Sequence, residues 1–276
     1  MDLTEFDDIG EVLLLSFCGI MALVFAAVVA ELRLAQFIKD PTASPRPRRS
    51  ARSAPARRRA LLRAVAAMRP GRRVLTVAWK LVTTATVVLT VVVMTGATLR
   101  FDARTLPWFT WLDHTEIGHG VARILVMGGQ FWLAGSVVVL LAVYRSIQAR
   151  NLRPAAVTGA AIMTMSVSLW LVKVLVGRTA PHSGANEVLD GGMSFPSGHA
   201  ATATVCLLLG VALGAGPAQV LSRRGRAMFG AASAGSAVVG VCTVVLGYHW
   251  LSDAVAGWMI GVVIALPAIR WLVPAP

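Results

Sequence analysis

Charged residues and cysteines are both scarce in this chain. Asp, Glu, Lys and Arg make up 14% of the 276 residues, whereas hydrophobic residues make up 56%. Together with a mean hydropathy of +0.70, this composition excludes an ordinary soluble globular domain. The three cysteines, Cys18, Cys206 and Cys242, lie inside apolar stretches without C-x-x-C spacing. We therefore expect neither a disulfide framework nor a thiolate metal site.

Apolar runs long enough to cross a bilayer dominate the sequence. A transmembrane helix needs about 20 predominantly apolar residues, whereas the alternation of apolar and polar residues that marks an outer-membrane barrel is absent. We predict an all-α, polytopic integral membrane protein with seven spanning helices. Their expected ranges are 10–32, 74–99, 124–144, 155–176, 199–216, 229–248 and 253–273.

The net charge of +13 comes almost entirely from one segment. Residues 33–73 hold twelve arginines and Lys39 against a single acid, Asp40. Apart from Phe37, the segment lacks the aromatic residues that stack on bases, which argues against a nucleic-acid partner. Its Ala, Pro and Ser content predicts a largely unfolded linker, and its basic residues predict contact with anionic lipid.

The same segment predicts the orientation of the chain, because cytoplasmic loops are enriched in Lys and Arg. If 33–73 is cytoplasmic, the basic turns 145–153 and 222–226 lie on its side of the membrane. The mixed-charge stretches 100–123 and 177–198 then lie outside. We expect three parts: an N-terminal transmembrane anchor (1–32), a basic cytoplasmic linker (33–73) and a six-helix membrane domain (74–276).

The tetrapeptide Pro196-Ser197-Gly198-His199 stands where a polar, Gly-rich loop meets an apolar run. A helix that begins near Gly198 would direct unpaired backbone N–H groups at the loop, which suits phosphate oxygens. Ser197 can cap that helix or donate to a phosphate oxygen, and His199 can protonate a leaving oxygen. The plainer alternative is an ordinary capped helix with a histidine at the lipid headgroups.

His249 and Asp253 are spaced i, i+4 at the edge of another apolar run. On a continuous helix they would share a face. A carboxylate bonded to one ring nitrogen fixes the tautomer and leaves the other nitrogen nucleophilic. The alternative is an interfacial histidine beside a helix-capping Asp253.

Lys173 lies inside the predicted span 155–176, about one turn before its end. A lysine at that depth is costly unless it reaches the interface or meets an anion. On the predicted topology, it lies on the same side of the membrane as the two histidine motifs. An anion-binding role is therefore favoured over simple snorkelling.

In order and spacing these motifs resemble those of the type 2 phosphatidic acid phosphatase family of membrane lipid phosphatases. That family reads K-x6-R-P, then P-S-G-H, then S-R-x5-H-x3-D, across the last part of a six-helix core. The resemblance implies that His249 is the nucleophile forming a phosphohistidine, that Asp253 is its partner and that His199 is the general acid. It also maps Lys173 onto the lysine of the first motif, and we expect Lys173, Ser197 and Gly198 to bind phosphate. It implies no metal and no cofactor.

Two positions depart from the pattern of this family. The first-motif arginine falls on Ala180, and the last-motif arginine falls on Thr243. In the family these arginines hold the non-bridging phosphate oxygens, so their loss weakens the expectation of ordinary phosphomonoesterase activity. Arg178 is predicted to supply one guanidinium in their place, because Gly177 should relax the helix there. His182 is a weaker substitute.

The expected function is a lipid phosphatase in the plasma membrane, with its active site on the extracytoplasmic face. Its substrate would be a phosphatidate-like or polyprenyl (di)phosphate lipid. Two alternatives stay open. One is a phosphotransferase or phosphodiesterase that moves a headgroup to an alcohol, since a phosphodiester carries less charge. The other is a catalytically inactive member that binds an anionic lipid. The lipid tail and the oligomeric state are left undetermined.

Overall fold

The computed structural model describes residues 75–215 and 222–273. The predicted anchor span (10–32) and the basic linker (33–73) lie outside these residues, so both stay predictions. The described residues from 83 onward belong to one compact unit, and residues 75–82 belong to another. Every predicted site residue lies in the first of these units.

Six described helices are long and apolar enough to cross a bilayer, and no strand occurs in the described ranges 75–215 and 222–273. These findings confirm the predicted all-α, polytopic membrane fold and its six-helix core. The spanning segments are Leu75–Met94, η2 (Phe131–Gly135) continued by α5 (Ser136–Ala149), α6 (Arg153–Val176), α7 (Gly198–Ala215), α9 (Arg223–Val245) and α10 (Leu251–Leu272).

The predicted span 74–99 is too long at its C-terminal end. The helix stops at Met94, and Gly96 follows with a φ of 77°, a conformation that an α-helix cannot contain. The chain then forms α3 (Leu99–Thr110) and α4 (Glu116–Val126). The stretch 100–123, left between two predicted spans, is therefore mostly helical.

The predicted span 124–144 begins in the wrong helix. α4 ends at Val126, and a short 3-10 turn, η1 (Met127–Gly129), separates it from the π-helical turn η2. Gln130 makes the break, because its extended backbone (φ −69°, ψ 126°) lies between η1 and η2. A Cβ on Gly129 would lie 2.6 Å from the carbonyl oxygen of His199. The close approach of η1 to α7 requires this glycine.

Two further boundaries differ from the sequence prediction. α9 begins at Arg223 rather than at residue 229, and the side chain of Ser222 caps it by accepting from the N–H of Gly225. It ends at Val245, three residues before the predicted end at 248. α10 begins at Leu251. His249 therefore lies in a turn between two helices instead of on a continuous helix with Asp253.

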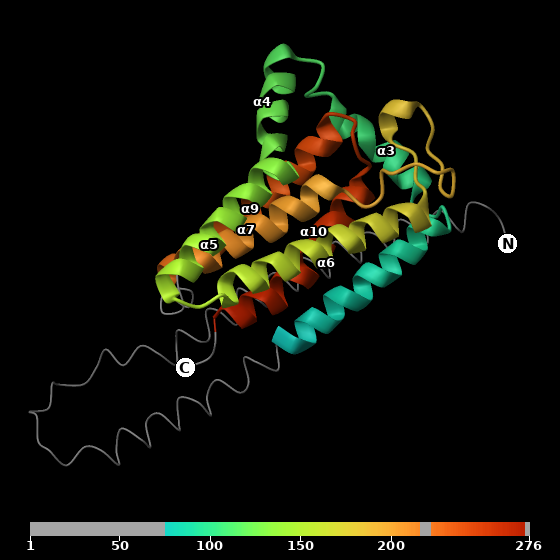
Figure 1. Cartoon of the computed structure of the whole chain (residues 1–276). Helices are drawn as coiled ribbons and strands as arrows, with labels where there is room; N and C mark the ends of the chain where they lie inside the picture. The colour runs from blue at the N-terminus through green and yellow to red at the C-terminus, as the bar shows by residue number, and fades with distance from the viewer. Residues whose placement is uncertain (1–74, 216–221, 274–276) are drawn as a thin grey trace, which may run out of the picture. The chain divides into compact units, whose positions relative to one another are not determined.

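α7 lies at the centre of the helical core. It packs against α5, α6, α9 and α10, and these helices run side by side in Figure 1. Val205 and Leu209 of α7 share one apolar cluster with Met165 of α6 and Ile264 of α10. Because lipid tails are as apolar as these side chains, close van der Waals packing rather than water exclusion holds such helices together in a bilayer.

Two glycines of α10 allow its close approach to α7. A Cβ on Gly257 would lie 2.5 Å from the carbonyl oxygen of Ser197, and one on Gly261 would lie 2.5 Å from Cβ of Thr204. The glycines are four residues apart, which is the small-xxx-small spacing of close membrane helix pairs. The α7–α10 contact therefore fixes the Ser197 turn against the helix that carries Asp253.

We predict that Gly257→Ala destabilises the protein, because the added methyl group meets backbone atoms that have no room to move. Overpacking of this kind costs about 1–3 kcal/mol, which should lower the thermal midpoint in detergent by several degrees. Gly210→Ala in α7 is the matched control, since a Cβ there meets nothing within 4 Å. An equal loss of stability in the two variants would contradict this account of the helix contact.

Candidate active site

Gly177 ends α6 and turns the chain into the site. It adopts the left-handed conformation, with φ 57° and ψ 36°, and its N–H donates to the carbonyl of Lys173. This is the helix ending that glycine favours, because no Cβ opposes it. Lys173 lies one turn earlier, and its Nζ donates to the carbonyl oxygen of Met193 at 2.5 Å. The lysine therefore faces the loop that precedes α7.

Backbone hydrogen bonds fold the loop 177–198 back on itself. The N–H of Asp190 donates to the carbonyl of Gly177, and the N–H of Ser194 donates to the carbonyl of Arg178. A Cβ on Gly192 would collide with the backbone of Arg178. These contacts bring Ser194 beside Arg178, although sixteen positions separate them in the sequence.

α7 begins at Gly198, as the sequence predicted. The N–H of Ser197 donates to the carbonyl oxygen of Asp253 at 2.9 Å, which joins the start of α7 to α10. A Cβ on Gly198 would meet nothing within 4 Å, so the backbone is open on that side. The first turn of α7 therefore offers backbone N–H groups to an anion, as helix N-termini do.

The two motif histidines face each other across the site. The ring centroids of His199 and His249 are 6.4 Å apart, with an angle of 65° between the ring planes. Nζ of Lys173 lies 3.5 Å from the carbonyl oxygen of Ser194, whose hydroxyl lies 3.3 Å from Nδ1 of His249. The structure thus brings together three residues that the sequence assigned to one site from three separate motifs.

Asp253 holds the ring of His249 on its Nδ1 side. Nδ1 lies 3.5 Å from Oδ2 of Asp253, and the same oxygen accepts from the backbone N–H of Trp250 at 3.0 Å. Asp253 thus caps α10 and faces His249, which combines the two alternative roles raised by its sequence position. With Nδ1 on the carboxylate side, Nε2 is the nitrogen left for a reacting group.

Ser194 is a site residue that the sequence prediction missed. Its Oγ donates to Oδ2 of Asp253 at 2.5 Å and lies 3.3 Å from Nδ1 of His249, and the side chain is buried. The hydroxyl therefore bridges a histidine–carboxylate pair whose direct separation is long for a hydrogen bond. Only its place two residues before Pro196 could have drawn attention to it.

Arg178 enters the site as predicted, but its contacts are with acceptors of the protein. Nη1 donates to Ser252 Oγ at 2.6 Å and to Asp253 Oδ1 at 2.9 Å. Nη2 donates to Asp102 Oδ2 at 2.8 Å and to Asn186 Oδ1 at 3.2 Å. The side chain is fully buried. The predicted contact of Arg178 with phosphate stays a prediction, and its observed partners point to a different role.

Asp102 of α3 is the second residue that the sequence did not single out. Besides Arg178, its carboxylate accepts from the backbone N–H of Ser252 at 3.0 Å and from the Ser252 hydroxyl at 2.6 Å. Burial raises the pKa of the Asp102 carboxyl above its ordinary value, while the Arg178 guanidinium and the Ser252 hydrogen bonds oppose that rise. The sequence offered no signal for Asp102, because the residue lies in a mixed-charge stretch that contains none of the motifs.

The two positions that lack the family arginines carry small side chains with local roles. Thr243 is fully buried, and its Oγ1 donates to the carbonyl of Gly240 at 2.6 Å. Its own carbonyl accepts from the N–H of His249 at 3.2 Å, which orients the turn that carries the histidine. Ala180 begins the short turn η3 (Pro181–Ser183). No hydrogen bond from His182 to the residues of the site is found in the described part of the chain.

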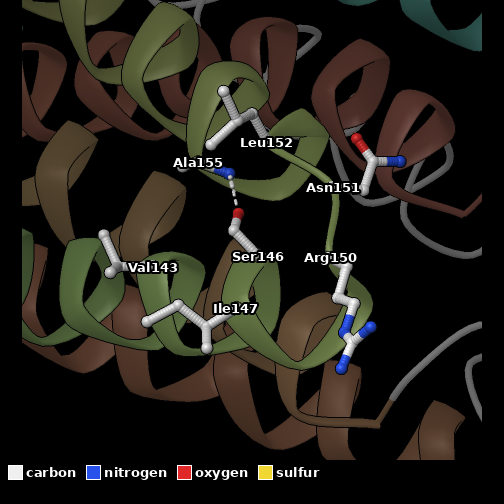
Figure 2. Close-up of a pocket in the computed structure, with 7 residues that line it drawn as sticks. All are labelled: Val143, Ser146, Ile147, Arg150, Asn151, Leu152 and Ala155. Carbon is white, nitrogen blue, oxygen red and sulfur yellow. Dashed lines mark hydrogen bonds between the residues drawn. The ribbon is translucent and has the colours of Figure 1, made fainter.

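A hollow of about 310 Å³ lies far from this chemistry, at the turn between α5 and α6 (Figure 2). Ala155 in its wall and Lys173 at the site stand about five helical turns, or about 27 Å, apart on α6. Apolar side chains make up most of the wall, and the Ser146 hydroxyl accepts from the N–H of Ala155 at 3.0 Å. The lining residues are Val143, Ser146, Ile147, Arg150, Asn151, Leu152 and Ala155.

Fold and site together define a polytopic α-helical membrane protein with two histidines and a carboxylate at one end of its helical core. A family model described as "PAP2 superfamily" matches residues 151–275, a stretch that contains α6 to α10. This part of the chain matches the PAP2 superfamily, which confirms the resemblance inferred from the motifs. Asp102 and α3 precede the matched residues.

A solved structure has the same fold. It is the first transmembrane PAP2-type phosphatidylglycerolphosphate phosphatase from Bacillus subtilis, which is similar to this chain with a TM-score of 0.58 and 16% sequence identity. The match covers 69% of this chain and 93% of the other. No curated protein sequence matches this chain.

Proposed function

We propose that this protein is a membrane lipid phosphatase whose active site opens on the extracytoplasmic face. Its substrate is a phosphatidate-like or polyprenyl (di)phosphate lipid, and the reaction passes through a phosphohistidine without a metal ion. The observation that supports this most is the placement of His249, which Asp253 and Ser194 hold from one side, opposite His199 at 6.4 Å. The fold it shares with a transmembrane phosphatase is consistent with the proposal.

The spacing of the two rings suits transfer of one phosphoryl group. A phosphorus atom about 3–3.5 Å from the attacking nitrogen, with its leaving oxygen about 3 Å from the second ring, fits between centroids 6.4 Å apart. Nε2 of His249 attacks phosphorus, and the bond to the lipid oxygen breaks as protonated His199 donates its proton to that oxygen. Lys173, Ser197 and the N–H of Gly198 hold the remaining phosphate oxygens.

Water completes the reaction. His199, now neutral, accepts a proton from a water molecule as its oxygen attacks the phosphohistidine. The bond between phosphorus and Nε2 breaks, inorganic phosphate leaves, and both histidines return to their starting states. Asp253 stabilises the positive ring that His249 carries while it bears the phosphoryl group.

The opposite end of the helical core supports the proposed orientation. Arg145 donates to the carbonyls of Leu213 and Gly214 at 2.6 Å each, so it lies at the C-terminal end of α7, whereas His199 lies at the N-terminal end. Arg150 and Arg153 share the basic turn next to Arg145. Positive turns favour the cytoplasmic side, which supports our proposal that the histidines lie on the extracytoplasmic side of the plasma membrane. In this orientation, the predicted contact of segment 33–73 with anionic lipid is made on the cytoplasmic side of the membrane.

Thiol labelling tests this orientation. In a background without the natural cysteines, Asp190→Cys should react with an impermeant maleimide in intact cells, because residue 190 is exposed in the loop at the histidine end. Arg150→Cys, in the exposed turn at the other end, should react only after lysis. The reverse pattern would place the active site on the cytoplasmic face.

Substitution of the histidines tests the assignment of the steps. His249→Ala should lower kcat by several orders of magnitude, because the nucleophile is lost. His199→Ala should cost about 10²–10⁴-fold with a lipid leaving group and much less with an activated aryl phosphate, which needs no acid. His182→Ala in the exposed η3 turn serves as the control. A near wild-type rate for His249→Ala would exclude the mechanism.

The alternative of a phosphodiesterase or headgroup transferase has its own support. Ala180 and Thr243 supply no guanidinium, and the terminal nitrogens of Arg178 are bonded to protein acceptors. Lys173 is then the one cationic side chain that the proposed mechanism assigns to the phosphate oxygens. A phosphomonoester has about two negative charges at neutral pH, whereas a phosphodiester has one. A site that binds the diester therefore needs less positive charge to balance its ligand.

A substrate panel distinguishes the two functions. Purified protein without added metal should release phosphate from phosphatidate, phosphatidylglycerol phosphate or polyprenyl diphosphate faster than it cleaves a phosphodiester lipid. Ala180→Arg should raise kcat/KM for the monoester by about tenfold or more, and Ser183→Arg, an exposed neighbour, should not. Faster cleavage of the diester by the wild type, lost in Ala180→Arg, would favour the alternative. Loss of turnover in chelator would contradict the metal-free reaction.

A further inference from the structure

We infer that Arg178 and Asp102 are positioning residues that hold the Asp253–His249 pair, so that α3 is part of the active site. This inference rests on the proposed function. The three charged side chains form one chain of contacts: Asp102 to Arg178 at 2.8 Å, and Arg178 to Asp253 at 2.9 Å. Asp102 lies outside the residues that match the PAP2 superfamily.

The contacts of Arg178 leave it no terminal N–H for a substrate. A guanidinium has four terminal N–H bonds, and the four acceptors are side-chain oxygens of Asp102, Asn186, Ser252 and Asp253. The fifth N–H, at Nε, is buried and has no partner among the described residues. Moving the N–H that binds Asp253 Oδ1 to a phosphate would take from this buried oxygen the donor that the structure gives it, which is unfavourable.

Arg178 fixes the rotation of the Asp253 carboxylate. It binds Oδ1, while Ser194 and the N–H of Trp250 bind Oδ2. With both oxygens held, Oδ2 is the one that faces Nδ1 of His249. Without Arg178 only Oδ2 would be held, so the rotation of the carboxylate would be less restricted and the imidazole would be oriented less well for attack.

Asp102 restores the negative charge that Arg178 would otherwise cancel. Asp253 paired with Arg178 alone is neutral. With Asp102 in the ionised form that its contact with Arg178 favours against the effect of burial, the two carboxylates and one guanidinium carry one net negative charge. That charge balances the positive ring of His249 in its protonated or phosphorylated form. All three side chains are fully buried, where such balance matters more than it does in water.

Substitutions that remove one charge from Asp102 or Arg178 distinguish the positioning role from a purely structural link between α3 and α10. The charged groups around His249 are Asp253 on α10, His199 on α7, Lys173 on α6, Arg178 in the following loop and Asp102 on α3. Asp102→Asn removes a negative charge and should lower the pH at which His249 titrates. Arg178→Gln removes a positive charge and should raise it, each by about one unit.

Nuclear magnetic resonance of ring-labelled histidine reads these titrations in detergent without any need for turnover. The His249 signal is identified by its loss in His249→Gln. Asp113→Asn is the matched control, because Asp113 pairs with His119 in a partly exposed contact outside the network. A midpoint for His249 that stays unmoved in both network variants would overturn the inference, whether or not the wild type is a phosphatase.

The double variant Asp102→Asn with Arg178→Gln covers the case in which a single variant fails to fold. It removes both charges and keeps polar side chains that can bond each other, so the net charge near His249 returns to that of the wild type. The titration midpoint should then return towards the wild-type value, while kcat falls about tenfold or more with an unchanged KM, because Asp253 is no longer held. A wild-type kcat in a folded double variant would contradict the positioning role.

Discussion

The contact of the Arg178 guanidinium with two carboxylates is the interaction on which the rest of the site depends. It joins α3, the loop after α6 and the start of α10 through Asp102 and Asp253, and all three side chains are buried. A buried arginine cannot be left unpaired without a large loss of stability. Each of these elements must therefore be in place before the site forms.

Helix packing supplies the second constraint. Gly257 and Gly261 let α10 lie directly against α7, and the backbone bond from Ser197 to Asp253 joins the two helices at their N-terminal ends. Since the hydrophobic effect does little between helices inside a bilayer, small residues and polar contacts of this kind determine which helices meet. The same contact therefore stabilises the fold and keeps the start of α7 beside the carboxylate.

Much of this arrangement could be predicted from the sequence, because composition and short motifs carry the necessary signals. Apolar runs indicated the membrane spans, and the Gly198 turn indicated where α7 begins. The helix boundaries near Gly96 and Gly129 were missed, because the sequence stays apolar through both positions while the helix is interrupted there.

Residues that act through tertiary contacts were beyond sequence reasoning. Asp102 is 151 positions from Asp253 in the sequence, and nothing in its neighbourhood distinguishes it from a solvated aspartate. Ser194 is likewise an ordinary loop serine until the fold places it 2.5 Å from the Asp253 carboxylate. Arg178 was predicted to belong to the site, but only its contacts in the structure show that its guanidinium faces the carboxylates of Asp102 and Asp253.

The central claim is that His249 carries the phosphoryl group during turnover. Rapid quenching of the purified protein with a lipid that bears labelled phosphate should trap a covalent, acid-labile and base-stable phosphoenzyme, and peptide mapping should place the label on His249. The label should be absent from His249→Ala. It should accumulate to a higher level in a variant in which hydrolysis of the phosphohistidine by water is slowed. Label on another residue, or turnover with no trapped intermediate at any quench time, would contradict the account.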